Sequence, residues 1–109
     1  MIEAITGSKS KEQVLAFIIT RKEGYARDIA RTFKASVTPI QKQLENLELN
    51  GVLVSKNVGR TVVFQINPRY AFKEEVEALL KKAISFYPEE LKEKLLYSRT
   101  RPRRQGKPL

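Results

Sequence analysis

The sequence predicts a single, mainly helical domain with one small β-hairpin, followed by a disordered basic tail. The chain has 109 residues, which is too short for two independent hydrophobic cores. Apolar residues recur at helical spacing in most of the chain, and only two short runs, 52–56 and 61–66, are rich in β-branched residues. We expect the folded domain to span residues 1–97 and the tail to span residues 98–109.

The first long helix is expected to begin after Ser10, whose hydroxyl can accept a hydrogen bond from the backbone N–H of Gln13. It should run to about Glu23, because Gly24 is the residue type that most readily adopts the left-handed conformation at a helix end. Its broad buried face consists of five apolar residues: Val14, Leu15, Phe17, Ile18 and Ile19.

A second, shorter helix is predicted at residues 25–33, since Tyr25, Ile29 and Phe33 lie four residues apart on one face. Residues 34–35 then form a short turn. A third helix begins next, and the two helices with their tight turn have the dimensions of a helix-turn-helix.

Ser36 is expected to cap this third helix, because Ser is among the preferred residues at the N-cap. Pro39 fits in the first turn, where the missing N–H has no partner within the helix, and Gly51 ends the helix. The buried stripe consists of three apolar residues: Ile40, Leu44 and Leu47.

The start of this third helix carries the candidate DNA-contacting residues: Ser36, Thr38, Gln41 and Lys42. In a helix-turn-helix, the second helix projects its first residues into the major groove of DNA. A Gln side chain can make two hydrogen bonds to adenine, and Lys can donate to guanine. A capping Ser and the free N–H groups around it are suited to a phosphate group.

A hairpin is predicted from the strands at 52–56 and 61–66, because Asn57 and Gly59 between them tolerate the positive φ angles of short connections. Pro68 closes the second strand. The expected order of elements is therefore three helices, two strands and one further helix, with a short additional helix after it.

The long helix expected at 69–87 repeats apolar residues in a 4-3-4-3 pattern, which is typical of a heptad seam. Pro88 ends it and can begin a further helix that runs to Tyr97. The seam is expected to join two copies of the chain, although it can also pack entirely on its own domain. The candidate dimerisation residues are Phe72, Val76, Leu79, Ala83 and Phe86.

The stretch S-V-T-P-I-Q-K-Q-L-E-N-L-E-L-N-G-V-L-V, followed by G-R-T-V-V-F-Q-I-N-P, resembles the winged helix-turn-helix of ArsR-like bacterial and archaeal repressors. The resemblance covers roughly residues 12–85. It implies a winged helix-turn-helix fold, a homodimer joined by the terminal helix, and a palindromic operator. It also implies that Lys56 and Arg60 in the wing contact the DNA backbone or minor groove.

The chain contains neither Cys nor His, which excludes a thiolate or imidazole metal sensor and removes the usual nucleophiles of many enzymes. Glu74 and Glu77 lie one helical turn apart, but carboxylates on a mixed-charge face are usually only solvated. We expect no enzyme activity, no metal site and no cofactor. Because no apolar run approaches the roughly 20 residues that cross a bilayer, and no signal peptide is evident, we expect a cytoplasmic protein with no membrane association.

The formal charge of +9 favours a nucleic-acid partner, and part of it lies in the tail. The leading prediction is a sequence-specific transcriptional regulator, most simply a homodimeric repressor that binds double-stranded DNA at an inverted repeat. An architectural or RNA-binding winged helix and a protein-interaction module remain open, and the sequence does not identify a small-molecule effector. The tail residues expected to contact DNA are Arg99, Arg101, Arg103 and Arg104.

Overall fold

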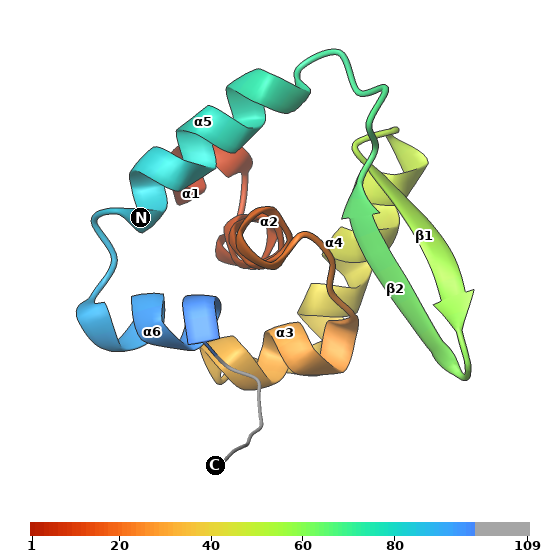
Figure 1. Cartoon of the computed structure of the whole chain (residues 1–109), viewed down its shortest axis with the longest axis horizontal. Coiled ribbons are helices and arrows are strands. Elements are labelled where there is room, and N and C mark those ends of the chain that lie inside the picture. Colours follow the sequence, from red (N-terminus) through yellow and green to blue (C-terminus); the bar gives the residue numbers. More distant parts are fainter. Residues whose placement is uncertain (98–109) are drawn as a thin grey trace, which may run out of the picture.

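The computed structural model describes residues 1–97, which form helices around a central helix and one antiparallel hairpin at the side (Figure 1). No described helix is long and apolar enough to cross a membrane. The predictions for the tail, from residue 98 onward, concern residues outside the described part of the chain. The elements are α1 (Glu3–Thr6), α2 (Lys9–Arg21), α3 (Ala26–Phe33), α4 (Val37–Leu49), β1 (Leu53–Val58), β2 (Thr61–Ile66), α5 (Lys73–Ile84) and α6 (Glu89–Tyr97).

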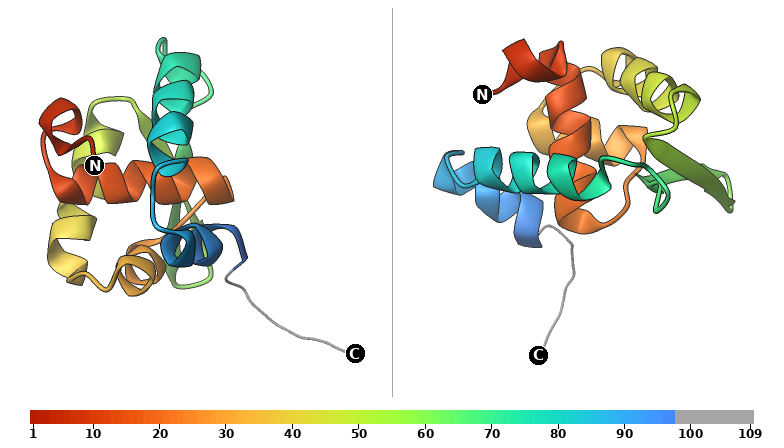
Figure 2. Two further views of the ribbon diagram at one scale, coloured as in Figure 1. Left: turned by 90° about the vertical axis from the view of Figure 1, so that its left-hand side faces the viewer. Right: turned by 90° about the horizontal axis from the view of Figure 1, so that it is seen from above.

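Helix α2 is the centre of the core and is seen end-on in Figure 1. Its buried face packs against α3, α4, α5, α6 and β2, and Figure 2 shows α5 crossing it at a steep angle. All five residues expected on its buried face are buried, and Ala16 joins them. The apolar spacing in the sequence therefore identified the central helix correctly.

Both ends of α2 differ from the prediction. The helix begins two residues earlier, because the hydroxyl of Ser8 rather than Ser10 accepts the capping hydrogen bond, from the backbone N–H of Lys11 at 3.1 Å. Gly7 in the left-handed region (φ 100°) ends the unpredicted helix α1 immediately before it, which leaves Ser8 extended and free to cap. At the other end, Lys22 takes the left-handed conformation expected of a glycine (φ 78°).

Gly24 has a different role from the predicted helix stop. Its backbone N–H and C=O pair with the C=O and N–H of Phe64 at 2.9 and 2.8 Å, so it forms an isolated β-bridge to the hairpin. A Cβ atom here would lie 2.7 Å from the ring of Phe17. Glycine is needed at this position because backbone and ring approach closely, not because φ is positive.

Helices α3 and α4 follow the predicted boundaries to within one or two residues. Lys34 in the left-handed region (φ 54°) makes the turn between them, and the N–H of Ala35 donates to the C=O of Ala30 at 2.8 Å. Ser36 occupies the N-cap of α4 as expected, but its hydroxyl makes no capping hydrogen bond. The apolar stripe of α4 is buried, which fixes the opposite face toward the surface.

The hairpin is longer than expected in its first strand, which reaches Val58 instead of residue 56. Asn57 pairs with Val62 inside the ladder, so the predicted positive φ at this residue was wrong. Gly59 does have a positive φ, of 63°, and forms the two-residue turn together with Arg60. The turn is therefore shorter and tighter than the sequence predicted.

The helix expected at 69–87 is shorter at both ends, because α5 spans only Lys73–Ile84. A turn precedes it, in which the side chain of Asn67 accepts from the N–H of Arg69 at 3.0 Å and donates to the C=O of Gly51 at 2.9 Å. The additional helix after Pro88 is confirmed as α6.

Long-range hydrogen bonds from two side chains, Arg21 and Tyr87, join α6 and the segment before it to α2. The guanidinium of Arg21 donates from Nε to the C=O of Leu95 at 2.5 Å and from Nη2 to the C=O of Lys94 at 3.0 Å. The hydroxyl of Tyr87 donates to Glu12, whose side chain is buried. The C-terminal part of the described chain is thus held against the central helix by polar as well as apolar contacts.

Candidate nucleic-acid interface

The predicted groove-facing residues of α4 do share one side of the helix. Thr38, Gln41 and Lys42 are spaced by three and four residues, so they are neighbours on the helix surface. Thr38 and Lys42 are exposed, while Gln41 is half-buried. Because the buried stripe holds the opposite side of α4 against the core, these side chains lie on the outer surface of the domain.

Gln41 has a partner that the sequence analysis missed. Its Nε2 donates to Oε2 of Glu45 at 2.9 Å, one turn further along α4. This hydrogen bond holds the amide of Gln41 in one orientation, with the amide oxygen available to accept a hydrogen bond from a ligand. It also places a carboxylate beside the surface expected to meet DNA, and a carboxylate opposes phosphate groups. The i,i+4 spacing of Gln41 and Glu45 is the signal that could have revealed it.

The N-terminal end of α4 is open to a ligand. Ser36 is exposed, its hydroxyl makes no capping hydrogen bond, and the first turn of α4 contains no acidic residue. The free N–H groups and the positive end of the helix dipole are therefore not neutralised locally. This arrangement suits an anion such as a backbone phosphate.

The two wing residues differ in their surroundings. Lys56 on β1 lies with Nζ 3.7 Å from Oε1 of Glu23, and both side chains are more than half exposed. Such a surface ion pair is weak and can be exchanged for a phosphate contact. Arg60 lies at the tip of the hairpin, is exposed, and forms no ion pair within residues 1–97.

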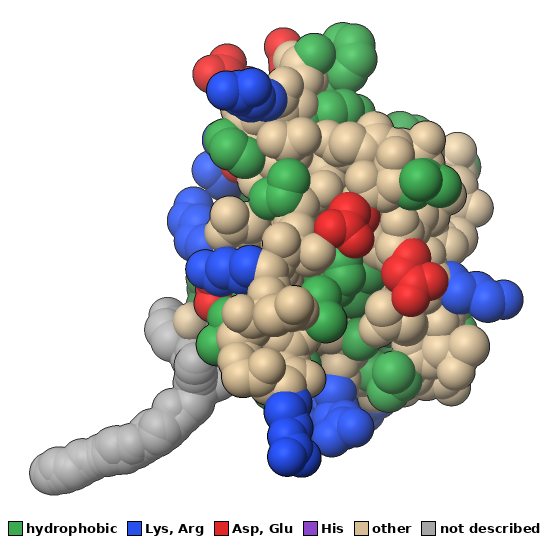
Figure 3. Space-filling view, turned by 90° about the vertical axis from the view of Figure 1, so that its right-hand side faces the viewer, with side chains coloured by type: hydrophobic (Ala, Val, Ile, Leu, Met, Phe, Trp, Pro, Cys, Tyr) green, Lys and Arg blue, Asp and Glu red, His purple; other side chains and the backbone are tan. Residues whose placement is uncertain are grey.

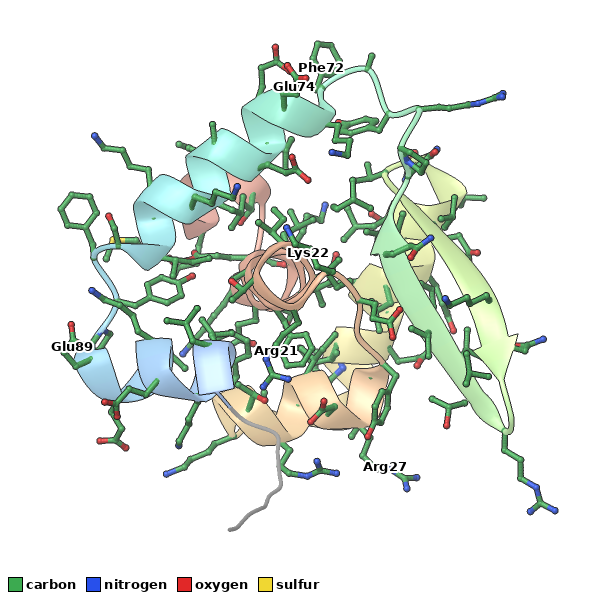
Figure 4. All side chains as sticks on the ribbon, in the orientation of Figure 1. Arg21, Lys22, Arg27, Phe72, Glu74 and Glu89 are labelled. Carbon is green, nitrogen blue, oxygen red and sulfur yellow. The ribbon has the colours of Figure 1, made fainter. Side chains whose placement is uncertain are left out.

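Arg27 is a further basic residue near this region. It lies in the first turn of α3, is exposed, and has no ion-pair partner in the described part of the chain. Figure 4 shows it pointing outward on the same lower edge of the molecule that the hairpin tip reaches. Its position beside the tip could not be read from local spacing.

The surface around the hairpin has a mixed charge. Figure 3, which faces the hairpin, shows acidic side chains in the middle of this face and Lys and Arg side chains around its edges. Glu48 of α4 contributes an acid here and accepts a hydrogen bond from the hydroxyl of Ser55 at 2.5 Å. The basic residues therefore form the rim of this face, with Arg60 at the hairpin tip.

The structure divides the five candidate dimerisation residues into two groups. Ala83 is buried and Val76 is half-buried against the core of the same chain. The other three are exposed apolar side chains: Phe72 at 60%, Leu79 at 37% and Phe86 at 64%. Figure 4 shows Phe72 pointing away from the body of the molecule.

Among residues 1–97, no group of three or more acidic side chains is arranged to hold a metal ion. The four candidate arginines of the tail, from Arg99 to Arg104, lie outside the described residues. Comparisons with protein-family models, curated proteins and solved structures give no match to this chain. Conclusions about function therefore depend on the geometry of the chain itself.

Proposed function

We propose that this protein is a winged helix-turn-helix regulator that binds a specific double-stranded DNA sequence as a homodimer. The observation that carries this proposal is the outer face of α4. That face presents Thr38, Gln41 and Lys42 beside an uncapped helix N-terminus, after a three-residue connection from α3. A helix of this kind fits the major groove, which is wide enough to admit it.

In this proposal α4 enters the major groove, and the open N-terminus at Ser36 binds a backbone phosphate. Gln41 and Lys42 contact base edges, and the hairpin acts as the wing, with Arg60 reaching the backbone or the minor groove. Arg27 adds a phosphate contact from the start of α3. Base contacts select the sequence, whereas the phosphate contacts fix the position of the protein on the duplex.

The exposed apolar side chains of α5 support a homodimer. Phe72, Leu79 and Phe86 lie seven residues apart, at the start of α5, within it and just after its end. Large exposed apolar groups in such a row favour burial against a second copy. A two-fold dimer presents two α4 helices to the two halves of an inverted repeat, and occupation of such a site represses transcription by blocking polymerase. We propose that this takes place in the cytoplasm of a bacterium or archaeon.

The deciding experiment is selection of bound fragments from a random duplex library by the full chain at about 0.15 M salt, where exposed charges are screened beyond roughly 8 Å. We expect an enriched inverted repeat with half-sites about one helical turn apart. Retention of duplexes without any enriched motif would instead indicate an architectural or RNA-binding protein. No retention at all would favour a protein-interaction module.

A further inference from the structure

A groove lies between the N-terminal half of α2, the C-terminal end of α3 and the start of α6. It consists of two adjoining pockets of about 230 and 380 Å³, neither of which includes a residue of α4. Because the two pockets share more than half of their lining residues, they form one continuous groove. The shared residues are Lys9, Gln13, Phe33, Pro88 and Leu91.

The floor of the groove is apolar. Phe33 and Leu91 are half-buried and pack against the hydrophobic core, and Pro88 lies beside them. At one end, the hydroxyl of Tyr87 donates to the carboxylate of Glu12. Glu12 also accepts from the N–H of Ile2 at 2.7 Å, so its charge is compensated within the protein. At this end of the groove, a ligand therefore meets mainly hydrocarbon surface and the phenol of Tyr87.

The rim of the groove is positively charged. Three lysines line it, Lys9, Lys34 and Lys94, and none of them forms an ion pair within residues 1–97. Glu90 is the acid on this rim, so the ammonium groups outnumber the carboxylate. The amide of Gln13 lies between the two pockets and can donate or accept a hydrogen bond.

We infer that this groove binds a small amphipathic organic anion. Its hydrocarbon body would cover Phe33 and Leu91, and its carboxylate would lie among the three lysines. Charge complementarity selects an anion over a neutral or cationic molecule of the same shape. The apolar floor selects a molecule with a hydrocarbon body over a simple inorganic anion, because burial of methylene groups supplies affinity.

The position of Lys34 connects this groove with α4. Lys34 makes the turn between α3 and α4, and Lys94 belongs to α6, which packs beside α3 (Figure 1). An anion that contacts both lysines would hold α6 against this turn. It would thereby change how far α4 can move relative to the rest of the domain. This regulatory part of the inference rests on the proposed function, whereas binding of the anion does not.

The test is a titration of the full chain, without DNA, followed by two-dimensional amide NMR spectra. The probes are hexanoate, acetate, hexylammonium and 1-hexanol. We expect saturable shifts with hexanoate at the residues that line the groove, with an affinity about tenfold or more above that of acetate. Lys94→Gln should weaken hexanoate binding several-fold, whereas the matched variant Lys82→Gln, an exposed lysine of α5, should not.

Three results would overturn the inference. Hexanoate and acetate could act alike, which would indicate only a general ion effect. Hexylammonium or 1-hexanol could bind as well as hexanoate, which would remove the role of the lysines. Lys94→Gln could bind hexanoate as tightly as Lys82→Gln does, which would also remove the role of Lys94.

A second titration, with the selected DNA, tests the regulatory part of the inference. That part is wrong if saturating hexanoate leaves the affinity for DNA unchanged. Failure to find a DNA site would overturn the proposed function and leave the first titration valid.

Discussion

The hydroxyl of Tyr87 donates a hydrogen bond to the buried carboxylate of Glu12, which lies 75 residues earlier in the chain. The side chain of Glu12 is only 4% exposed and is further satisfied by the N-terminal ammonium at 3.2 Å and the N–H of Ile2 at 2.7 Å. This cluster connects the N-terminus, the central helix and the segment before α6. A buried acid requires such partners, because an unsatisfied carboxylate is costly in the interior.

Replacement Tyr87→Phe removes one donor from Glu12 and should lower the free energy of unfolding by about 1–3 kcal/mol. Urea unfolding of the full chain measures this change. The control is Tyr70→Phe, since Tyr70 is half-buried and its hydroxyl makes no hydrogen bond within residues 1–97. Equal stability of the two variants would contradict the role assigned to Tyr87.

The same contact predicts a dependence of stability on alkaline pH. Burial, and then the hydrogen bond to Glu12, raise the pKa of Tyr87 above its ordinary value of 10.0. The phenol therefore holds its proton more tightly in the folded protein than in the unfolded chain. Its contribution to the free energy of unfolding is complete below about pH 10 and declines as the pH rises above that value. The difference in unfolding free energy between the parent and Tyr87→Phe should therefore shrink above that pH. A constant difference up to pH 11 would be inconsistent with this account.

Gly24→Ala is predicted to destabilise the protein strongly, because the added Cβ would lie 2.7 Å from the ring of Phe17. Overpacking of this kind costs about 1–3 kcal/mol, and the bridge to Phe64 limits backbone relief. The double variant Gly24→Ala with Phe17→Leu tests the cause in thermal or urea unfolding. If the clash is responsible, the alanine should cost less in the Phe17→Leu background. Equal cost in both backgrounds would point to another cause.

Glu45→Gln is predicted to increase DNA affinity if α4 lies in the major groove. The substitution removes a negative charge beside Gln41 and weakens the contact that holds its amide. Electrophoretic or fluorescence titrations with the selected duplex should show a gain that decreases as salt is added. Glu75→Gln, an exposed acid of α5, changes the net charge equally and should have a smaller effect. Equal gains would mean that only net charge matters.

If the proposed dimer forms, Phe86→Glu should convert it to a monomer, since this exposed ring, just after the end of α5, belongs to the row of exposed apolar residues with Phe72 and Leu79. A charge buried in an apolar interface without a partner is strongly unfavourable. Sedimentation equilibrium of the full chain measures the change. Val62→Glu serves as control, because Val62 is an exposed apolar residue on the hairpin. A parent protein that is monomeric at all concentrations would refute the dimer directly.

Apart from the short helix α1, the helices, the hairpin and their order could be predicted from the sequence because they depend on local periodicity. The α2 cap could not, because Ser10 carries the stronger local signal, with Gln13 three residues later, whereas Ser8 is followed at that spacing by Lys11. The choice between them depends on Gly7, which ends a four-residue helix that has too little periodicity to recognise. The sequence correctly indicated that glycine matters at position 24, but the predicted reason, a left-handed helix end, was wrong. A sequence does not distinguish a positive φ from a close approach of the backbone to an aromatic ring.

The candidate site was only partly accessible to sequence reasoning. The spacing of Thr38, Gln41 and Lys42 placed them on one face, and the structure brings them together there. The heptad pattern on α5 could not distinguish residues that face the core, such as Ala83, from residues that face outward, such as Phe86. That division depends on how α5 lies across α2, a long-range relationship.

The β-bridge between Gly24 and Phe64 gives the base of the hairpin a third extended segment. An isolated two-stranded hairpin is only marginally stable in water, so this segment anchors the base to the connection between α2 and α3. The direction of the hairpin is then set by its base, and its reach is set by its length. Two residues added to each strand would carry Arg60 about 7 Å further along the same line with the same face outward. Hairpin length is thus an independent means of adjusting where the tip lies, without repacking of the core.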